Sequence, residues 1–292
     1  MSKGDGGAVV EAARAKVNLF LHVLGRRADG YHLLELACRV RRGRRSSSAP
    51  NRPRLFRFRS PGRSAGGLEA GEDNLVLRAA RSLAAATGTV AGARLTLDKR
   101  LPVAAGIGGG SADAAATLRA LNRLWGLGLD HPRLAAIALA LGADVPVCLG
   151  SRAVRMGGIG EVLAPAPRLP RFGLLLANPG IPLATATVFA ARAGPFDPPA
   201  DLPEGWPDAI AMAKDLARFR NGLEAAARAL CPPLAEVLDA LSALPGALLA
   251  RLSGSGPTAF ALLATAEEAV LAAARLRTTY PAWWIAAGEA GG

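Results

Sequence analysis

The chain is short of cysteine and of long apolar runs, and both shortages limit what it can be. Cys38, Cys148 and Cys231 are an odd number of cysteines without close spacing in 292 residues, which argues against a disulfide framework or a zinc site. No apolar run reaches the ~18 residues that a membrane span needs. The charged N-terminal stretch MSKGDGGAVVEAARAK has no signal-peptide core. These absences favour a cytoplasmic protein without a membrane segment.

Acidic residues are also few, and the resulting positive charge is local. The chain has 23 acidic and 35 basic residues, for a net charge of +12. Ten arginines and no acidic residue lie between Arg39 and Arg63. Such a cluster is typical of a solvated hairpin or of a nucleic-acid patch. Phe56 and Phe58 are the few aromatic residues available there for base stacking, so a solvated, poorly ordered Arg-rich hairpin is favoured and nucleic-acid binding is the alternative.

The composition predicts a globular protein of mixed architecture. Hydrophobic residues make up 51% of the chain and the mean hydropathy is +0.24, enough for one large domain or two lobes. Strand and helix patterns alternate in mixed order, which indicates an α+β fold. The Pro-rich stretch Ala164–Pro170 is the candidate boundary between an N-terminal lobe, 1–163, and a C-terminal lobe, 164–292.

The strongest local pattern is the stretch Leu101–Asn122, LPVAAGIGGGSADAAATLRALN. Glycines fill four of the five positions from Gly106 to Gly110, so the backbone can approach a ligand closely. A helix is predicted next, with Ser111 and Asp113 as cap-type residues at its start. A helix N-terminus behind a glycine-rich loop favours a phosphate group. The alternative is an ordinary turn before a buried helix, because neither GxxxxGK[ST] nor a clear GxGxxG is present.

Three further segments carry residues suited to chemistry. Lys16 and Asn18 are two apart on a predicted strand and therefore face the same side. Asp144 lies at a helix end, before a short strand predicted at 145–148. The small-residue turn Ser253–Gly256 would let backbone approach a ligand. Each of these features alone is more often structural than functional.

Taken together, four motifs resemble those of the GHMP kinase superfamily. They are AKVNLFLHVLGRRADGYHLLE, PVAAGIGGGSADAAATLRALNRLWGLGL, GADVPVCLG and LSGSGPTAFALL, in that order. Lys16-x-Asn18 with Asp29–His32 narrows the resemblance to the branch that phosphorylates a CDP-linked methylerythritol in non-mevalonate isoprenoid synthesis. The resemblance implies a two-lobed α+β kinase with mixed sheets and helices, an active site in the cleft between the lobes, and ATP and Mg²⁺ as cofactors.

The resemblance also implies roles for individual residues. Asp144 matches the catalytic acid group that takes the proton from the substrate hydroxyl, and Lys16 matches the lysine that keeps this carboxylate ionised. Residues matching the ATP-binding positions are Asn74, Pro102, Ala104, Gly106, Gly108, Gly109, Gly110, Ser111 and Ala112, with Ser111 also on the Mg²⁺ side. Residues matching the substrate-binding positions are Asn18, Tyr31, His32, Phe189, Gly254 and Ser255.

Some of these assignments have simpler explanations. Asn74 would serve equally well as a helix N-cap, and a helical phenylalanine such as Phe189 is usually part of a core. Ala104, Ala105 and Asp113 depart from the residues expected in the glycine loop, and Asp113 is tolerable there if it caps the helix or faces Mg²⁺.

The competing functions are another small-molecule kinase of the superfamily, such as a homoserine or mevalonate kinase, and a basic nucleic-acid-binding protein. A family member that binds nucleotide without catalysis is disfavoured because both Lys16 and Asp144 are present. The expected partners are small-molecule substrates, without a membrane and without nucleic acid, and the protein is expected to be a monomer or a weak homodimer.

Overall fold

The computed structural model describes residues 8–40, 45–51, 56–59, 73–103, 105–150 and 152–292. The described chain forms two compact units whose sequences interleave. Unit 1 comprises Met1–Lys16, Val40–Val103 and Gly108–Arg152, and unit 2 comprises Val17–Arg39, Ala104–Ile107 and Ala153–Gly292. The contacts thus group residues 17–39 with the C-terminal half, and the division at residues 163 and 164 stays a prediction.

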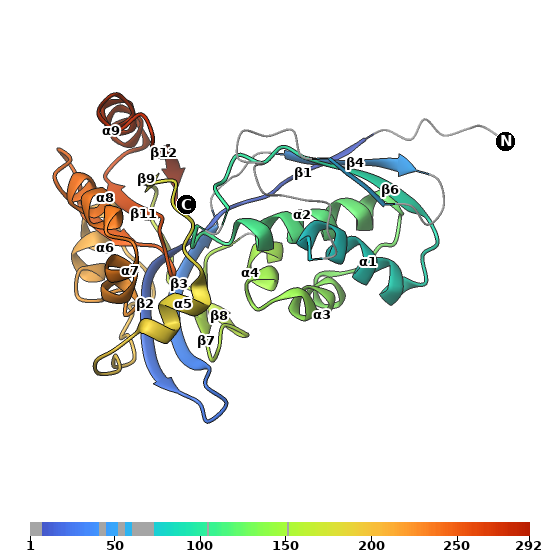
Figure 1. Ribbon diagram of the computed structural model, residues 1–292, viewed down its shortest axis with the longest axis horizontal. Helices are drawn as coiled ribbons and strands as arrows, with labels where there is room; N and C mark the ends of the chain where they lie inside the picture. The colour runs from blue at the N-terminus through green and yellow to red at the C-terminus, as the bar shows by residue number, and fades with distance from the viewer. Residues whose placement is uncertain (1–7, 41–44, 52–55, 60–72, 104, 151) are drawn as a thin grey trace. The chain divides into compact units, whose positions relative to one another are not determined.

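Unit 1 is a four-stranded sheet with helices on one side (Figure 1). The strand order is β1 (Val9–Ala12), β4 (Arg45–Asn51), β6 (Gly92–Leu97), β5 (Phe56–Arg59), with only the β5–β6 pair parallel. The helices are α1 (Leu75–Thr87), α2 (Gly109–Leu124), α3 (His131–Leu141) and α4 (Asp144–Gly150). Alanine and leucine side chains of α1 and α2 fill the core between helices and sheet.

Local sequence signals set the ends of two of these helices. The Asn74 side chain accepts a hydrogen bond from the Val76 amide and so caps α1, and Gly88 ends that helix in the left-handed conformation. Asp130 caps α3 through the Arg133 amide. The sequence predicts both starts and the glycine end of α1, because Asn and Asp are typical N-cap residues and Gly is typical after the last helical turn; the structure confirms all three.

The short strand predicted at 145–148 is wrong. These residues lie in helix α4, where Val145 to Leu149 are all buried. A buried segment this short is apolar on every side, so it has neither the period of an exposed strand nor that of a surface helix. Pro146 is compatible with the helix because it lies in the first turn, where a backbone N–H has no intrahelical acceptor.

Unit 2 contains two antiparallel sheets and the remaining described helices (Figure 1). One sheet has the order β2 (Lys16–Arg26), β3 (His32–Val40), β7 (Val154–Gly157), β8 (Val162–Pro165), and the other has β10 (Leu249–Leu252), β11 (Ala259–Leu263), β9 (Phe172–Asn178), β12 (Trp284–Ala290). The helices are α5 (Thr185–Ala191), α6 (Ala209–Leu216), α7 (Glu224–Leu230), α8 (Pro233–Ser242) and α9 (Ala266–Thr279).

Strand β9 lies at the centre of unit 2 and is buried along its whole length. Phe172, Leu174 and Leu176 pack into the core that contains α6. The opposite face of β9 meets α9, and a side chain at Gly173 would overlap the Thr265 carbonyl there. Burial on both faces explains the continuous apolar run of this strand, which the sequence pattern predicts correctly.

The arginine-rich segment contributes two strands to unit 1. The strict alternation RLFRFR at 54–59 predicts a strand, and β5 confirms it for the described part, Phe56–Arg59. Strand β4, RSSSAPN, pairs with both β1 and β6 and was not predicted, because its sequence lacks apolar alternation. Residues 41–44, 52–55 and 60–72 of the predicted hairpin lie outside the described residues.

Candidate active site

Lys16 and Asp144 form an ion pair in unit 1. Lys16 begins β2 and Asp144 begins α4, yet the Lys16 Nζ and the Asp144 Oδ1 lie 2.7 Å apart. The Lys16 side chain is almost completely buried, whereas 38% of the Asp144 side chain is exposed. The carboxylate is therefore held by a buried cation and remains accessible from solvent. The structure thus joins two residues that are 128 positions apart in the sequence.

The start of α2 lies directly beside this pair. Its N-cap is Gly108, which has a φ of 60° and makes no side-chain cap bond. A Cβ on Gly108 would lie 3.3 Å from the Lys16 Cβ, so the glycine permits the close approach. The unpaired amides of the first turn carry the positive end of the helix dipole. The glycine backbone, the lysine and the carboxylate therefore meet at one place.

The capping predicted for Ser111 and Asp113 is wrong. Helix α2 begins two residues before Ser111, at Gly109. The Asp113 carboxylate instead accepts a hydrogen bond from Lys99 Nζ in a buried ion pair. Burial raises the pKa of Asp113, and the nearby Lys99 ammonium partly opposes this shift. Lys99 lies under the glycine stretch, because a Cβ on Gly109 would be 3.3 Å from its Nζ.

The preceding part of the glycine loop belongs to unit 2 and packs against the turn Ser253–Gly256. A Cβ on Gly106 would lie 2.5 Å from the Ser253 carbonyl oxygen, and one on Gly254 would lie 2.6 Å from the Gly106 carbonyl oxygen. Both glycines also have positive φ. Asn221 supports the turn by donating from Nδ2 to the carbonyls of Leu252 and Gly254. Two segments predicted separately from sequence are thus in contact.

Two of the predicted substrate-binding residues stack in unit 2. The rings of His32 and Phe189 have centroids 5.2 Å apart and an interplanar angle of 29°. Burial, followed by the charges of Arg26 and Arg192, lowers the pKa of His32. Tyr31, the neighbour of His32, is largely exposed. A neutral imidazole stacked on a phenyl ring and flanked by an exposed tyrosine is suited to a flat aromatic ligand.

Asn18 is fully buried, and its side-chain amide makes no hydrogen bond with the residues that the structure describes. Its backbone N–H donates to Ser253 Oγ at 3.2 Å, which places it beside the same turn. The hydroxyls of Ser255 and Thr185 lie 2.9 Å apart. A buried amide without a partner is costly, so the Asn18 side chain is a polar group that a ligand could satisfy.

The other predicted nucleotide-binding residues have mainly structural surroundings. Asn74 is the N-cap of α1, which is the simpler of the two roles considered for it. Gly110 is close to Leu75 of the same helix. Ala112 is buried, and its amide donates to the Gly108 carbonyl. Pro102 is half-buried in the loop before α2, and Ala104 lies outside the described residues.

Sequence reasoning missed two charged residues that support the site, Lys99 and Arg119. Lys99 is the last lysine before the glycine loop, and nothing in the local pattern pairs it with Asp113. Arg119 stands within the otherwise buried run of α2 from Ala112 to Leu121. A lone basic residue in such a run is a usable signal, because a buried cation needs partners.

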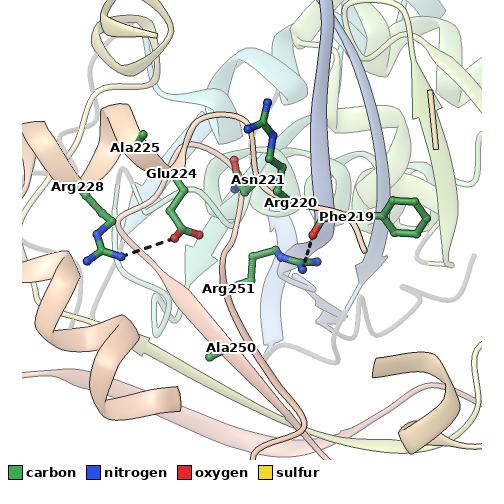
Figure 2. Close-up of a pocket in the computed structure, with 8 residues that line it drawn as sticks. All are labelled: Phe219, Arg220, Asn221, Glu224, Ala225, Arg228, Ala250 and Arg251. Atoms are coloured by element: carbon green, nitrogen blue, oxygen red, sulfur yellow. Dashed lines mark hydrogen bonds and ion pairs between the residues drawn. The ribbon is translucent and has the colours of Figure 1, made fainter. Parts of the chain in front are cut away.

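A polar cavity of about 620 Å³ lies in unit 2, and none of the predicted site residues lines it (Figure 2). Arg251, buried at its wall, donates to the carbonyls of Leu19, Leu216 and Phe219, and burial lowers its pKa to about 10. Arg220, also on the wall, pairs with Asp197. These cations therefore hold chain segments of unit 2 together.

Comparisons with known proteins agree with the motifs. Residues 74–152 match the GHMP kinases N terminal domain and residues 206–282 match the GHMP kinases C terminal domain. Two curated relatives are named 4-diphosphocytidyl-2-C-methyl-D-erythritol kinase. The one from Gluconacetobacter diazotrophicus is 50% identical, over 97% of this chain and 95% of the relative. The one from Cereibacter sphaeroides is 52% identical, over 94% and 96%.

Solved structures extend the comparison. A crystal structure of 4-(cytidine 5'-diphospho)-2C-methyl-D-erythritol kinase is 37% identical, with a TM-score of 0.77, over 97% of this chain and 99% of the other. Homoserine kinase from Cytophaga hutchinsonii has a TM-score of 0.67 at 18% identity, over 99% and 96%. This second likeness shows the fold alone.

The matched domains and the fold define a small-molecule phosphotransferase of the GHMP kinase class, as the motifs predict. Kinases of this class use ATP. Within the class, the chain belongs to the 4-diphosphocytidyl-2-C-methyl-D-erythritol kinase family. Among the described residues, no helix has the length and apolar character to cross a membrane.

Proposed function

We propose that the chain transfers the γ-phosphate of ATP to the 2-hydroxyl of 4-diphosphocytidyl-2-C-methyl-D-erythritol, a step in non-mevalonate isoprenoid precursor synthesis. The names of relatives at 50% and 52% identity support this substrate. The observation that carries the chemistry is the ion pair of Lys16 and Asp144 beside Gly108.

Asp144 acts as the base in this proposal. Its carboxylate is partly exposed, so it can accept the proton of an incoming hydroxyl as the oxygen attacks phosphorus. Lys16 keeps the carboxylate ionised and stabilises negative charge on the reacting oxygen. Phosphoryl transfer depends mainly on positioning and charge stabilisation, and the buried end of the lysine, fixed by β2, supplies both.

The amides and glycines at the start of α2 hold the ATP phosphates in this proposal, and Ser111 is placed to contact Mg²⁺. Among the described residues no three His, Cys, Asp or Glu side chains gather as a metal site. Mg²⁺ fits this arrangement, because it is commonly held by substrate phosphates, waters and one or two protein oxygens. The Ser111 hydroxyl, in the first turn of α2, is such an oxygen. When bound, the metal neutralises phosphate charge.

The cytidine end of the substrate is assigned to unit 2. His32 and Phe189 provide a stacked aromatic surface, Tyr31 an exposed ring, and Asn18 a buried amide available for hydrogen bonding. The backbone of Gly254 and the hydroxyl of Ser255 are the remaining proposed contacts of this end.

The activity is tested by ADP release from purified protein, ATP and Mg²⁺ with one acceptor at a time. We expect turnover with the CDP-linked methylerythritol and none with homoserine or mevalonate. Turnover with one of the latter two alone would contradict the substrate assignment. Salt-dependent RNA or DNA binding without any ADP release would favour the basic-protein alternative instead.

The roles of Asp144 and Lys16 are tested by Asp144→Asn and Lys16→Met. Both variants should bind ATP and lose turnover by about 10²-fold or more. The matched control is Asp98→Asn: the Asp98 side chain is also 38% exposed and also paired, with Arg100, but it takes no part in the proposed site. Near-normal kcat in Asp144→Asn would remove Asp144 as the base.

We further propose that the protein works in the cytoplasm as a monomer or weak homodimer. Sedimentation across a range of protein concentrations tests the second point, and a concentration-independent larger assembly would contradict it.

A further inference from the structure

Arg119 lies in the middle of α2, and its side chain donates four hydrogen bonds within unit 1. Its Nε donates to Glu11 Oε2 at 3.1 Å, and Nη2 donates to the Ala12 carbonyl at 2.9 Å. Its Nη1 donates to the carbonyls of Cys148 and Leu149, at 3.1 and 3.2 Å. One guanidinium group thus joins α2 to β1 and to the end of α4.

Two of these elements, α2 and α4, carry parts of the proposed catalytic site, and β1 precedes Lys16, which begins β2. Strand β1 ends at Ala12, four residues before Lys16. Helix α4 begins at Asp144 and ends just after the two carbonyls that Arg119 binds. Helix α2 begins beside Lys16, at the glycine stretch. Arg119, on the helix whose start is proposed to face the phosphates, therefore contacts the helix that carries the carboxylate and the strand that precedes the lysine.

The chemistry of arginine suits this position. A guanidinium offers five N–H donors in a fixed plane, so it can hold several acceptors at fixed angles. Two of its acceptors are terminal carbonyls of α4, the negative end of that helix, which a cation stabilises. Glu11 supplies the compensating charge, and its side chain is only 15% exposed.

We propose that Arg119 is a positioning residue for the reaction, which fixes α4 against β1 and thereby sets the separation and orientation of Asp144 and Lys16. The proposal rests on the function proposed above. A misplacement of about 1 Å at a reacting group can cost ~10²-fold in rate. Removing the hydrogen bonds of Arg119 to β1 and α4 should therefore lower kcat. Binding of ATP should change little, because the guanidinium N–H groups of Arg119 are directed at Glu11 and at backbone carbonyls of β1 and α4.

Arg123 provides a matched control. It lies one turn further along α2, and its Nη1 donates to the same Glu11 carboxylate at 2.8 Å. Unlike Arg119, it makes no hydrogen bond to α4 among the described residues, and 64% of its side chain is exposed, against 21% for Arg119. Arg123→Gln removes the same charge from the same helix and the same partner while leaving α4 held.

The experiment compares steady-state kinetics of Arg119→Gln, Arg119→Lys and Arg123→Gln with the unchanged enzyme, using thermal unfolding to confirm that each is folded. We expect Arg119→Gln to lower kcat about 10- to 100-fold, with the KM for ATP changed less than about 3-fold. Arg119→Lys, which keeps the charge but not the fork, should be only partly active. Arg123→Gln should stay within about 2-fold of normal.

A second arm separates positioning from general loosening. In the Asp144→Asn background, Arg119→Gln should cost little further turnover, because residues that act as one unit are non-additive. Guanidinium added to Arg119→Ala should restore part of the kcat. Full multiplication of the two losses, or a normal kcat in folded Arg119→Gln, would overturn the proposal. A normal kcat in Asp144→Asn alone would reveal failure of the base assignment itself, and the positioning role would fall with it.

Discussion

The contribution of the buried ion pair of Lys99 and Asp113 to the stability of unit 1 can be tested quantitatively. Their side chains are only 3% and 6% exposed, so neither charge can be solvated if its partner is removed. The perturbation is Lys99→Met, which leaves the Asp113 carboxyl buried without its cation. Loss of one member of a buried pair typically costs ~3–5 kcal/mol.

An upper limit follows from the titration of the stranded carboxyl. An ionised Asp113 without a partner will take up a proton instead, and this costs free energy because pH 7 lies about 3 units above its ordinary pKa of 3.8. Each unit is worth ~1.4 kcal/mol, so neutralisation costs at most about 4 kcal/mol at pH 7. The two estimates agree, and we expect Lys99→Met to lose about 3–4 kcal/mol.

The same argument fixes the pH dependence. In the variant, the pKa of Asp113 in the folded state lies above its value in the unfolded state, so the folded state binds the proton more tightly. The stability contributed by this proton is fully present below pH 3.8 and is lost as the pH rises through the folded-state pKa. The deficit of Lys99→Met relative to the unchanged protein should therefore shrink as the pH is lowered from 7 towards 5, by at most ~1.4 kcal/mol for each pH unit. Removing Lys99 together with Asp113, as Lys99→Met with Asp113→Leu, should recover most of the loss.

The assay is urea unfolding at several pH values without nucleotide, followed by far-ultraviolet circular dichroism and by tryptophan fluorescence. Asp113→Asn leaves Lys99 buried without its carboxylate, so it should lose a similar amount of unfolding free energy at pH 7. This loss should not shrink at pH 5, because no buried carboxyl remains to be neutralised. A Lys99→Met deficit below about 1 kcal/mol, or one that does not change with pH, would show that water reaches the pair and would refute the reasoning.

Four further predictions concern the candidate site and unit 2. Gly106→Ala should abolish activity or folding, because residue 106 has a positive φ and the added Cβ would lie 2.5 Å from a backbone oxygen. The control is Gly126→Ala, where the added Cβ meets open space. A fully active Gly106→Ala would contradict the packing. Phe189→Ala should raise the KM for the CDP-linked substrate about 2- to 12-fold through loss of ring stacking, with the KM for ATP unchanged. The pKa of His32 is lowered, so its imidazole is neutral at pH 7. The KM for the CDP-linked substrate should therefore stay constant from pH 8 to about 6.5 and change only below about pH 6.5. A change in KM centred above pH 7 would contradict this. Arg251→Met should destabilise unit 2 by more than about 2 kcal/mol, measured by urea unfolding, since three buried carbonyls lose their donor.

Local chemistry made much of the chain predictable. The α+β class, the caps of α1 and α3, the buried strand β9 and the order of the four motifs follow from residue types and spacing. The pairing of Lys16 with Asp144 was also expected, but from the family resemblance, because no local pattern links residues 128 positions apart. The strand predicted at 145–148 was wrong because a short, fully buried apolar run has no period that separates strand from helix.

The sequence by itself determined many of the helices and strands, though not α4 or β4, and that a glycine-rich stretch would precede α2, because caps, alternation and glycine act within a few residues. The tertiary structure alone decided the partners of the buried charges. In the folded protein Asp113 pairs with Lys99 and does not cap the helix, and Arg119 hydrogen-bonds to β1 and α4. The physical reason is that a charge removed from water must find its acceptors wherever folding places them, and those acceptors here are often backbone carbonyls, which every residue carries and no sequence pattern distinguishes.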